Sequence, residues 1–193
     1  MRVNPVHPLC PDLYCRSLSE LDFSILASHG RVHVCLDLDN TIALRESFEP
    51  AEGVPESLDR ARREGHVQAF CLVSNIIWGR HRRQRLEHFS RILGIPHFYG
   101  ALLWNRKPSP RPFREAMRMM GSEPRTTAIV GDQIFTDVAG GKKLGLYTVL
   151  VQPLGPDHWT TFWSGRRRQE IAILESSGMR LHPEDPPPPD PHP

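Results

Sequence analysis

Five short apolar runs, separated by segments of helical character, constrain the fold of this chain more than any other feature. The runs are rich in β-branched residues and cover residues 32–38, 67–73, 98–103, 127–130 and 147–151. Runs of this length and composition are typical of β-strands. Because they are almost continuously apolar, they predict strands that are covered on both faces, as in a parallel sheet.

Helical patterns fill the gaps between these runs. Three helices are predicted between the strands, over residues 55–64, 80–93 and 110–120. Each is followed by a glycine, the residue most common just beyond a helix C-terminus. Two more helices are expected outside the alternating part, over residues 16–29 and 158–175. The alternation predicts βαβ crossovers and therefore an α/β fold of the Rossmann type, a three-layer sandwich with a central parallel sheet.

The length of 193 residues fits one domain with short tails. We expect an N-terminal segment over residues 1–16, a single domain over 17–176, and a tail over 177–193. That tail ends in HPEDPPPPDPHP, a composition that cannot bury a core and that predicts disorder.

Charge and cysteine usage limit the partners and the compartment. Lys and Arg number 24 against 22 Asp and Glu, so bulk charge predicts no nucleic-acid partner. Cys35 and Cys71 lie in apolar runs, and Cys10 and Cys15 could bridge or share a metal site, but a reduced pair fits their spacing better. Without a secretory signal or an apolar run of about 18 residues, a cytoplasmic protein is expected. The oligomeric state is not predicted.

Polar residues follow four of the predicted strands at the point where each strand ends. In chain order they are Asp37, Asp39, Thr41, Ser74, Asn75, Lys107, Asp132 and Asp137. The carboxyl ends of parallel strands meet at one edge of a sheet, and ligands of such sheets bind there. These side chains are therefore expected to gather in one crevice.

The acidic members of this set predict a metal site. Residues two apart in a strand point the same way, so Asp37 and Asp39 can project together. With Asp132 they form an oxygen ligand set that suits Mg²⁺. Asp137 is expected just behind the ligands, orienting Lys107 or a metal-bound water.

The same residues can carry out phosphoryl transfer. We expect Asp37 to be the nucleophile that forms an aspartyl-phosphate, and Asp39 to be the general acid and base. The groups expected to bind the phosphoryl oxygens are those of Thr41, Ser74, Asn75 and Lys107. Ser74 could also act only as a helix cap.

These motifs resemble those of the haloacid dehalogenase (HAD) superfamily of phosphatases. DLDNT matches the DxDxT motif, Ser74 the second motif, Lys107 the third, and GDQIFTD the fourth, in the same order. Residues 11–155 are similar to the YqeG family of subfamily IIIA. That resemblance implies a HAD-like fold, a Mg²⁺ cofactor and a phosphorylated substrate, with the phospholipid phosphatidylglycerophosphate as the leading one.

The spacing and the local charge bear on how that substrate is reached. About thirty residues separate Thr41 from Ser74, roughly one crossover, so no cap domain is expected and the site should be open. Aromatic and basic residues mix in WGRHRRQR, which contains Arg82 and Arg83, and in HWTTFWSGRRR. Such segments predict peripheral contact with an anionic membrane, on its inner face, although a solvated helix face is the competing interpretation.

Two other functions fit the same residues. One is a phosphatase for a soluble nucleotide or sugar phosphate, which needs no membrane. The other is a phosphoryl-accepting signalling or binding module, because receiver domains also gather acidic residues and a lysine at the end of a sheet. The intact Asp39 favours rapid release of the phosphoryl group and therefore the enzyme.

Overall fold

The computed structural model describes residues 7–76, 80–155 and 166–179. Its centre is a sheet of six parallel strands in the order β1-β6-β5-β2-β3-β4. The strands are β1 (Leu13–Cys15), β2 (His33–Leu36), β3 (Ala69–Ile76), β4 (His97–Leu102), β5 (Thr127–Gly131) and β6 (Tyr147–Val151). Strand β2, which precedes the first acidic motif, therefore lies in the interior of the sheet, between β5 and β3.

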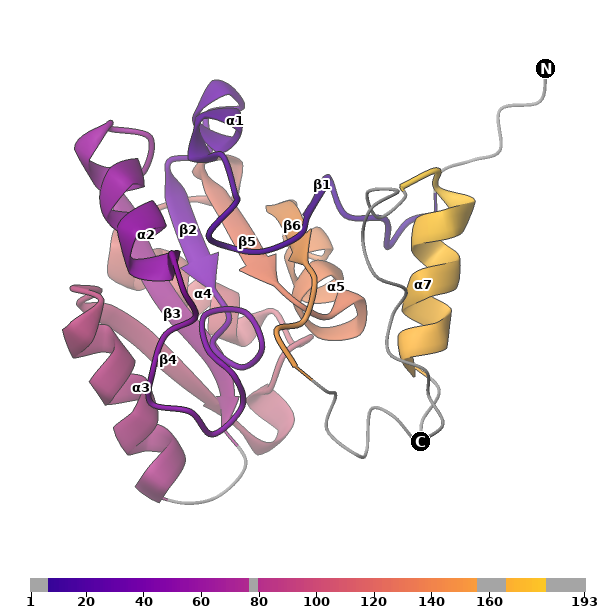
Figure 1. Cartoon of the computed structure of the whole chain (residues 1–193). Helices are drawn as coiled ribbons and strands as arrows, with labels where there is room; N and C mark the ends of the chain where they lie inside the picture. The colour runs from indigo at the N-terminus through magenta and orange to yellow at the C-terminus, as the bar shows by residue number, and fades with distance from the viewer. Residues whose placement is uncertain (1–6, 77–79, 156–165, 180–193) are drawn as a thin grey trace.

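Helices cover both faces of this sheet (Figure 1). They are α1 (Phe23–Ser28), α2 (Val54–Arg63), α3 (Arg80–Ile92), α4 (Arg111–Met120), α5 (Ala139–Lys142) and α7 (Arg166–Ser176). Short helical turns add η1 (Leu103–Asn105), η2 (Pro124–Thr126) and η3 (Ile134–Val138). In the view of Figure 1, α2 and α3 lie in front of the sheet and α4 lies behind it.

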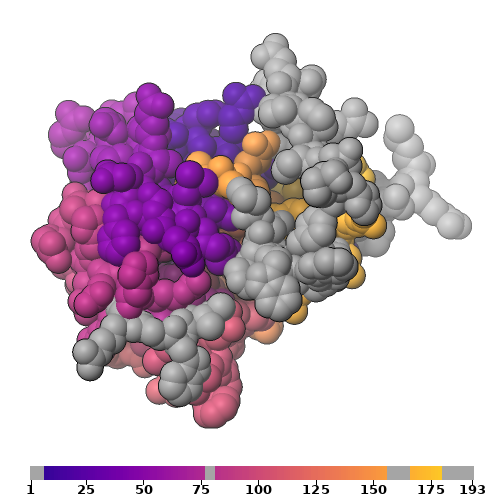
Figure 2. Space-filling model, turned by 60° about the horizontal axis from the view of Figure 1, so that its bottom comes forward, coloured from indigo at the N-terminus to yellow at the C-terminus, as the bar shows by residue number. Residues whose placement is uncertain are grey.

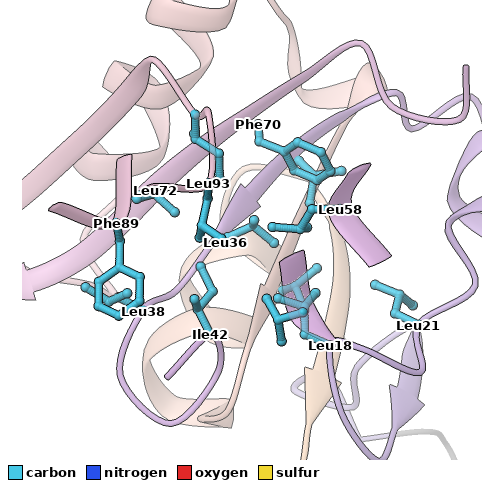
Figure 3. Packing of buried hydrophobic residues seen from close by; sticks show 14 of the residues in the cluster. Leu18, Leu21, Leu36, Leu38, Ile42, Leu58, Phe70, Leu72, Phe89 and Leu93 are labelled. Carbon is cyan, nitrogen blue, oxygen red and sulfur yellow. The ribbon is translucent and has the colours of Figure 1, made fainter. Parts of the chain in front are cut away.

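The core divides between the two faces because alternate residues of a strand point to opposite sides. On β2, Val34 and Leu36 pack with the side of α2 and α3, whereas Cys35 packs with Phe113 of α4. Figure 3 shows the larger cluster, in which Leu36 lies among leucines and phenylalanines of several elements. Burying one such side chain contributes about 1.5 to 3 kcal/mol, so these layers hold β2 rigidly in place.

The expected fold class is confirmed. All five strands predicted from the sequence are present, and helices lie on both faces of the sheet. Between β2 and β4 the described residues form α2, β3 and α3 with the loops that connect them, which agrees with the expectation of no cap domain. None of the described helices combines the length and the apolar character needed to cross a membrane.

The N-terminal part differs from the prediction in two ways. Residues 16–29 do not form one helix; α1 starts only at Phe23, where the Asp22 side chain accepts a hydrogen bond from Ser24 N at 2.9 Å. The turn before it buries Leu18 and Leu21 in the core. In addition, Leu13–Cys15 forms the edge strand β1, inside the segment that the sequence separated from the domain. A three-residue strand is too short to show a periodic pattern, so the sheet itself decides this pairing.

Several features named in the sequence lie outside the described residues. They are the aromatic residues Trp78, Trp159, Phe162 and Trp163, the first part of the helix expected at 158–175, and the proline-rich tail.

Candidate active site

The carboxyl ends of the strands meet at the lower edge of the sheet in Figure 1, and Figure 2 turns this edge toward the viewer. Asp37 follows the last residue of β2 and is buried. Its backbone N–H donates to Val130 O on β5 at 2.9 Å, which continues the sheet pairing by one residue. The Asp37 carboxylate thus follows an interior strand of the sheet, and this placement leaves it little conformational freedom.

Lys107 joins two of the acidic residues. Its Nζ donates to Asp37 Oδ1 and to Asp137 Oδ1, both at 2.6 Å, and its side chain is almost fully buried. Its backbone is fixed as well, because Asn75 on β3 accepts from Lys107 N at 2.8 Å and donates to Lys107 O at 3.2 Å. The lysine therefore reaches the end of β2 from a loop that β3 holds in register.

Three carboxylates converge at this point. Asp37, Asp132 and Asp137 each place a carboxylate oxygen within 4.8 Å of the others, and all three residues are buried. Asp132 directly follows β5, and Asp137 lies in η3, a π-helical turn in which Val138 N reaches back to Gln133 O. Since Asp37 is far in sequence from Asp132 and Asp137, only the assembled sheet brings the three carboxylates together.

Gly131, the last residue of β5, makes room for this arrangement. A Cβ at Gly131 would overlap the carboxylate of Asp137. That carboxylate also accepts from Thr136 Oγ1 at 3.1 Å and from Gln133 N at 3.3 Å through its second oxygen. Both oxygens of Asp137 therefore accept from protein donors, one of which is Lys107. Its place behind the metal ligands stays a prediction.

Burial and mutual repulsion shift the protonation of the cluster. Burial raises the pKa of Asp37 to about 7, against the charge of Lys107 and with the added repulsion of Asp137 and Asp39. Burial, followed by the charges of Asp37 and Asp137, raises the pKa of Asp132 well above its ordinary value. Burial opposes the charged form of Lys107, but the carboxylates of Asp137 and Asp37 outweigh it and raise the pKa of that ammonium. The cluster holds more negative charge than its one ammonium balances.

The residues present fit a divalent cation. Both oxygens of Asp132 are buried, and neither accepts a hydrogen bond from the residues that the structure describes; Arg167 approaches Oδ2 only at 3.6 Å. Three carboxylates against one lysine leave an excess of two negative charges. Hard oxygen ligands with that charge suit Mg²⁺.

Asp39 lies apart from this cluster. Its side chain is ion-paired with three arginines, hydrogen-bonding to Arg85 and lying 3.5 Å from Arg82 Nη1 and 3.8 Å from Arg45 Nη1. The carboxylate group that converges with Asp37 and Asp132 is that of Asp137. The assignment of Asp39 as a metal ligand stays a prediction, and the structure gives its carboxylate another set of partners.

The remaining predicted residues border the same edge. Thr41 is buried, and its Oγ1 has no hydrogen-bond partner among the described residues; Ser74 is buried on β3. The side-chain amide of Asn75 hydrogen-bonds to the backbone of Lys107. Its role as a phosphate ligand stays a prediction.

Three residues near the site were not foreseen from the sequence. Arg85 lies on the buried side of α3, and an arginine directly before the inward Leu86 is the one signal that could have drawn notice. Arg167 of α7 donates to Asp132 O at 3.0 Å, and Glu170 accepts from Phe135 N at 3.2 Å. The helix α7 thereby contacts the loop that carries Asp132, and nothing in its sequence marks those contacts.

Comparison with known proteins agrees with this geometry. Residues 104–153, which include Lys107, Asp132 and Asp137, match the family described as HAD-hydrolase-like. The chain is 28% identical to the probable phosphatase YqeG of Bacillus subtilis (strain 168) over 173 residues, 89% of this chain and 93% of that protein.

A plant protein and a solved structure extend the comparison. The chain is 25% identical over 86% of its length to phosphatidylglycerophosphate phosphatase 1, chloroplastic/mitochondrial, of Arabidopsis thaliana, and covers 47% of that protein. A crystal structure of an uncharacterized protein from Listeria monocytogenes serotype 4b has the same fold, with a TM-score of 0.53 and 12% identity, over 75% of this chain and 99% of that one.

The fold, the acidic site and these similarities support a phosphatase that is similar to the HAD-like hydrolases. Within that class it is similar, over nearly its whole length, to YqeG.

Proposed function

We propose that this phosphatase is a Mg²⁺-dependent phosphomonoester hydrolase that works through an aspartyl-phosphate on Asp37 and acts on a lipid phosphate, with phosphatidylglycerophosphate as the leading substrate. The observation that carries the chemistry is the convergence of Asp37, Lys107, Asp132 and Asp137 at the end of β2.

In the first half of the reaction, a carboxylate oxygen of Asp37 attacks the phosphorus. Lys107 holds Oδ1, so Oδ2 is the oxygen that forms the new P–O bond. The bond from phosphorus to the substrate alcohol breaks, and Asp39 in its acid form gives its proton to the departing alkoxide. Lys107, Thr41 and Ser74 stabilise the charge on the phosphoryl oxygens in the transition state.

In the second half, water replaces the alcohol. Asp39, now a carboxylate, takes a proton from water, whose oxygen attacks the phosphorus while the bond to Asp37 breaks. Inorganic phosphate leaves, Asp37 is a carboxylate again and Asp39 has regained its proton, so the cycle balances.

Asp37 and Asp132 would hold the Mg²⁺ ion, with Asp137 behind them. When bound, the ion supplies positive charge that draws the anionic phosphate toward Asp37. Asp132 contributes by orientation, because Arg167 fixes its backbone carbonyl at 3.0 Å.

The lipid substrate is supported first by similarity to a protein named as a phosphatidylglycerophosphate phosphatase over 86% of this chain. It is supported also by the surface next to the site. Leu102 is the last residue of β4, and Leu103 and Trp104 follow it shortly before Lys107; all three are exposed, Trp104 to 85%.

The backbone of this apolar loop (residues 102–104) is strained. Leu103 has φ +49°, a left-handed conformation that costs a non-glycine residue roughly 1 to 2 kcal/mol. Strain at an exposed loop beside a site is typical of a functional position. An apolar loop at the rim of an open site favours contact with the interfacial region of an anionic membrane. The contact proposed is therefore peripheral.

The experiment measures phosphate release from phosphatidylglycerophosphate in vesicles and from soluble nucleotide and sugar phosphates. Activity on the lipid that EDTA abolishes and Mg²⁺ restores is the expected result. A panel in which only soluble phosphates are hydrolysed would contradict the lipid substrate and leave the phosphatase.

A double variant tests the apolar loop. Leu103→Ser with Trp104→Ser should lower kcat/KM on vesicles about tenfold or more, because apolar area is lost at the interface. Soluble phosphates should be unaffected. Ile92→Ser is the matched control: Ile92 is 45% exposed and is the last residue of α3, just before the chain enters β4 at the amino end of the parallel strands. Equal losses in the double variant on both substrate types would contradict the proposed membrane contact.

A further inference from the structure

Four arginines form a cluster next to the site: three are paired with Asp39, and the fourth, Arg106, lies near Arg82. They are Arg45 in the loop after β2, Arg82 and Arg85 in α3, and Arg106 in the loop after η1. The acidic residues paired with them are Asp39 and Glu46. The described part of this cluster therefore carries more positive than negative charge.

Arg85 is a fixed part of the frame. It is buried, donates to Ser47 O at 2.6 Å and to Leu44 O at 2.9 Å, and lies over the ring of Phe89 at 5.2 Å. The same guanidinium hydrogen-bonds to Asp39 Oδ1. Its donors are used by the protein, so it holds Asp39 and is not available to a ligand.

Arg45 and Arg82 are held much more loosely. Their nearest atoms lie 3.8 and 3.5 Å from Asp39 Oδ2, beyond the length of a charge-assisted hydrogen bond. Their side chains are 22% and 24% exposed. The Nε of Arg45 is buried with no hydrogen-bond partner among the described residues, and the other partner of Arg82, Glu46, is 3.7 Å away and largely exposed. Both guanidinium groups retain donors for an incoming anion.

The surroundings raise the free energy of this arrangement in the absence of an anion. Arg82 lies in the first turn of α3, where the helix dipole disfavours a cation by about 0.3 to 1 kcal/mol. Burial, together with the nearby charge of Arg82, lowers the pKa of the Arg106 guanidinium. Like charges gathered at a partly buried site favour an anionic ligand.

We propose that Arg45 and Arg82 form a subsite for a second phosphate of the substrate, a phosphodiester joined to the reacting phosphomonoester by a short alcohol linker. This rests on the proposed function, because Asp37 must be the residue that receives the phosphoryl group. Asp39 follows Asp37 by two residues, about 7 Å along an extended backbone. A glycerol bridge between two phosphates spans a comparable length, and guanidinium groups match phosphate oxygens in pairs. The arginines thus select which phosphomonoesters bind productively.

The test uses four substrates that separate the second phosphate from the acyl chains. Phosphatidylglycerophosphate has both, its deacylated form glycerophosphoglycerophosphate has only the second phosphate, phosphatidic acid has only the chains, and glycerol 3-phosphate has neither. Arg82→Ala and Arg45→Ala are compared with Arg83→Ala. Arg83 is the matched control, because it is 76% exposed and pairs with Glu87 at 3.0 Å on the same helix.

Arg82→Ala and Arg45→Ala should each lower kcat/KM about tenfold to a hundredfold on the two substrates with a second phosphate, whether acylated or not. The reason is that each variant loses a hydrogen bond to a charged group. The other two substrates should change less than about threefold. Arg83→Ala should match wild type on the two substrates without acyl chains, where membrane contact plays no part. Glycerophosphoglycerol, which has the phosphodiester alone, should inhibit wild type at least tenfold more strongly than Arg82→Ala, with glycerol 3-phosphate as the assayed substrate.

Three results would overturn the subsite. Equal losses on all four substrates would mean that the arginines only position Asp39. Losses confined to the two acylated substrates would mean that they bind the vesicle surface. Arginine variants that match Arg83→Ala on every substrate would mean that no second phosphate is bound there. Failure of the proposed function is distinguishable, because wild type with Mg²⁺ would then not hydrolyse phosphatidylglycerophosphate.

Discussion

Asp37 and Asp39 stand two residues apart, yet their surroundings differ in most physical respects. Asp37 is buried, 2.6 Å from a buried lysine and next to two more buried carboxylates. Asp39 faces arginines, two of them partly exposed and held by ion pairs of 3.5 and 3.8 Å. The two side chains are exposed to a similar small extent, so the contrast lies in their partners: carboxylates and a lysine around Asp37, arginines around Asp39. Two neighbouring carboxylates therefore suit two different tasks in the proposed reaction: Asp37 receives the phosphoryl group, and Asp39 transfers protons beside arginines that can bind an anion.

The largest effect on turnover is expected when Asp37 is substituted. Asp37→Asn keeps the shape and the contact with Lys107 but removes the nucleophile, so turnover should fall about 10⁴-fold or more. The thermal midpoint of unfolding should not fall, because the variant no longer has to bury the charge of Asp37. Phosphate release and thermal melting check both points, and wild-type-like turnover would rule out the aspartyl-phosphate.

Asp39→Asn should have a smaller effect on turnover. General acid and base catalysis contributes about 10²- to 10⁴-fold, so lipid turnover should fall by that range. With p-nitrophenyl phosphate, whose leaving group needs no proton, a burst of one nitrophenol per enzyme followed by a slow phase is expected. A burst in wild type, with a phospho-enzyme lasting minutes, would instead favour the signalling module.

Arg85 sharpens the comparison because it belongs to the frame and not to the subsite. Arg85→Ala should lower kcat about tenfold to a hundredfold on every substrate alike, as Asp39 loses its fixed position. It should also destabilise the fold by about 1 to 3 kcal/mol, because the carbonyls of Leu44 and Ser47 lose their buried donor. Denaturant unfolding and kinetics with Arg83→Ala as control measure the two effects. A substrate-dependent loss would place Arg85 in the subsite.

The smallest effect concerns pH and the stability of the metal-free protein. The pKa of Asp37 is raised to about 7 in the fold from an ordinary value of 3.8, so its protonated form contributes stability below about pH 4. That contribution is lost as pH rises through 7, and the raised pKa of Asp132 acts in the same direction.

With EDTA, the free energy of unfolding should therefore fall by about 1 to 3 kcal/mol between pH 5 and pH 8. Mg²⁺ should stabilise the protein more at pH 8 than at pH 5, because the carboxylates must be ionised to bind it. Asp132→Asn should reduce both the pH dependence and the Mg²⁺ effect. Thermal melts at the two pH values measure this, and equal Mg²⁺ effects at both would contradict binding by these carboxylates.

The sequence predicts the strands because they are buried on both faces and so read as unbroken apolar runs. It predicts the neighbourhood of Asp37, Lys107, Asp132 and Asp137 for a related reason: each follows a strand, and the carboxyl ends of parallel strands must share one edge. Local signals failed where an element was short or its partner distant. The strand β1 has three residues, and α1 is shortened by Asp22 and by the burial of the turn before it.

Side-chain partnerships divide in the same way. The sequence placed Asp39 beside Asp37 among the metal ligands, since a strand alternates with period two. The structure pairs its carboxylate with Arg85, 46 residues away, and ties the Asp132 loop to Arg167 and Glu170 of α7. Nothing local specifies these contacts, because they depend on how α3 and α7 pack.

By itself, then, the sequence determined the strands, the edge at which the chemistry is placed and the residue types that perform it, because burial and strand ends leave periodic, local marks. Only the tertiary structure decided which carboxylate faces the lysine and which faces the arginines. Those choices depend on packing between elements far apart in the chain, whose energy is not recorded in any one segment.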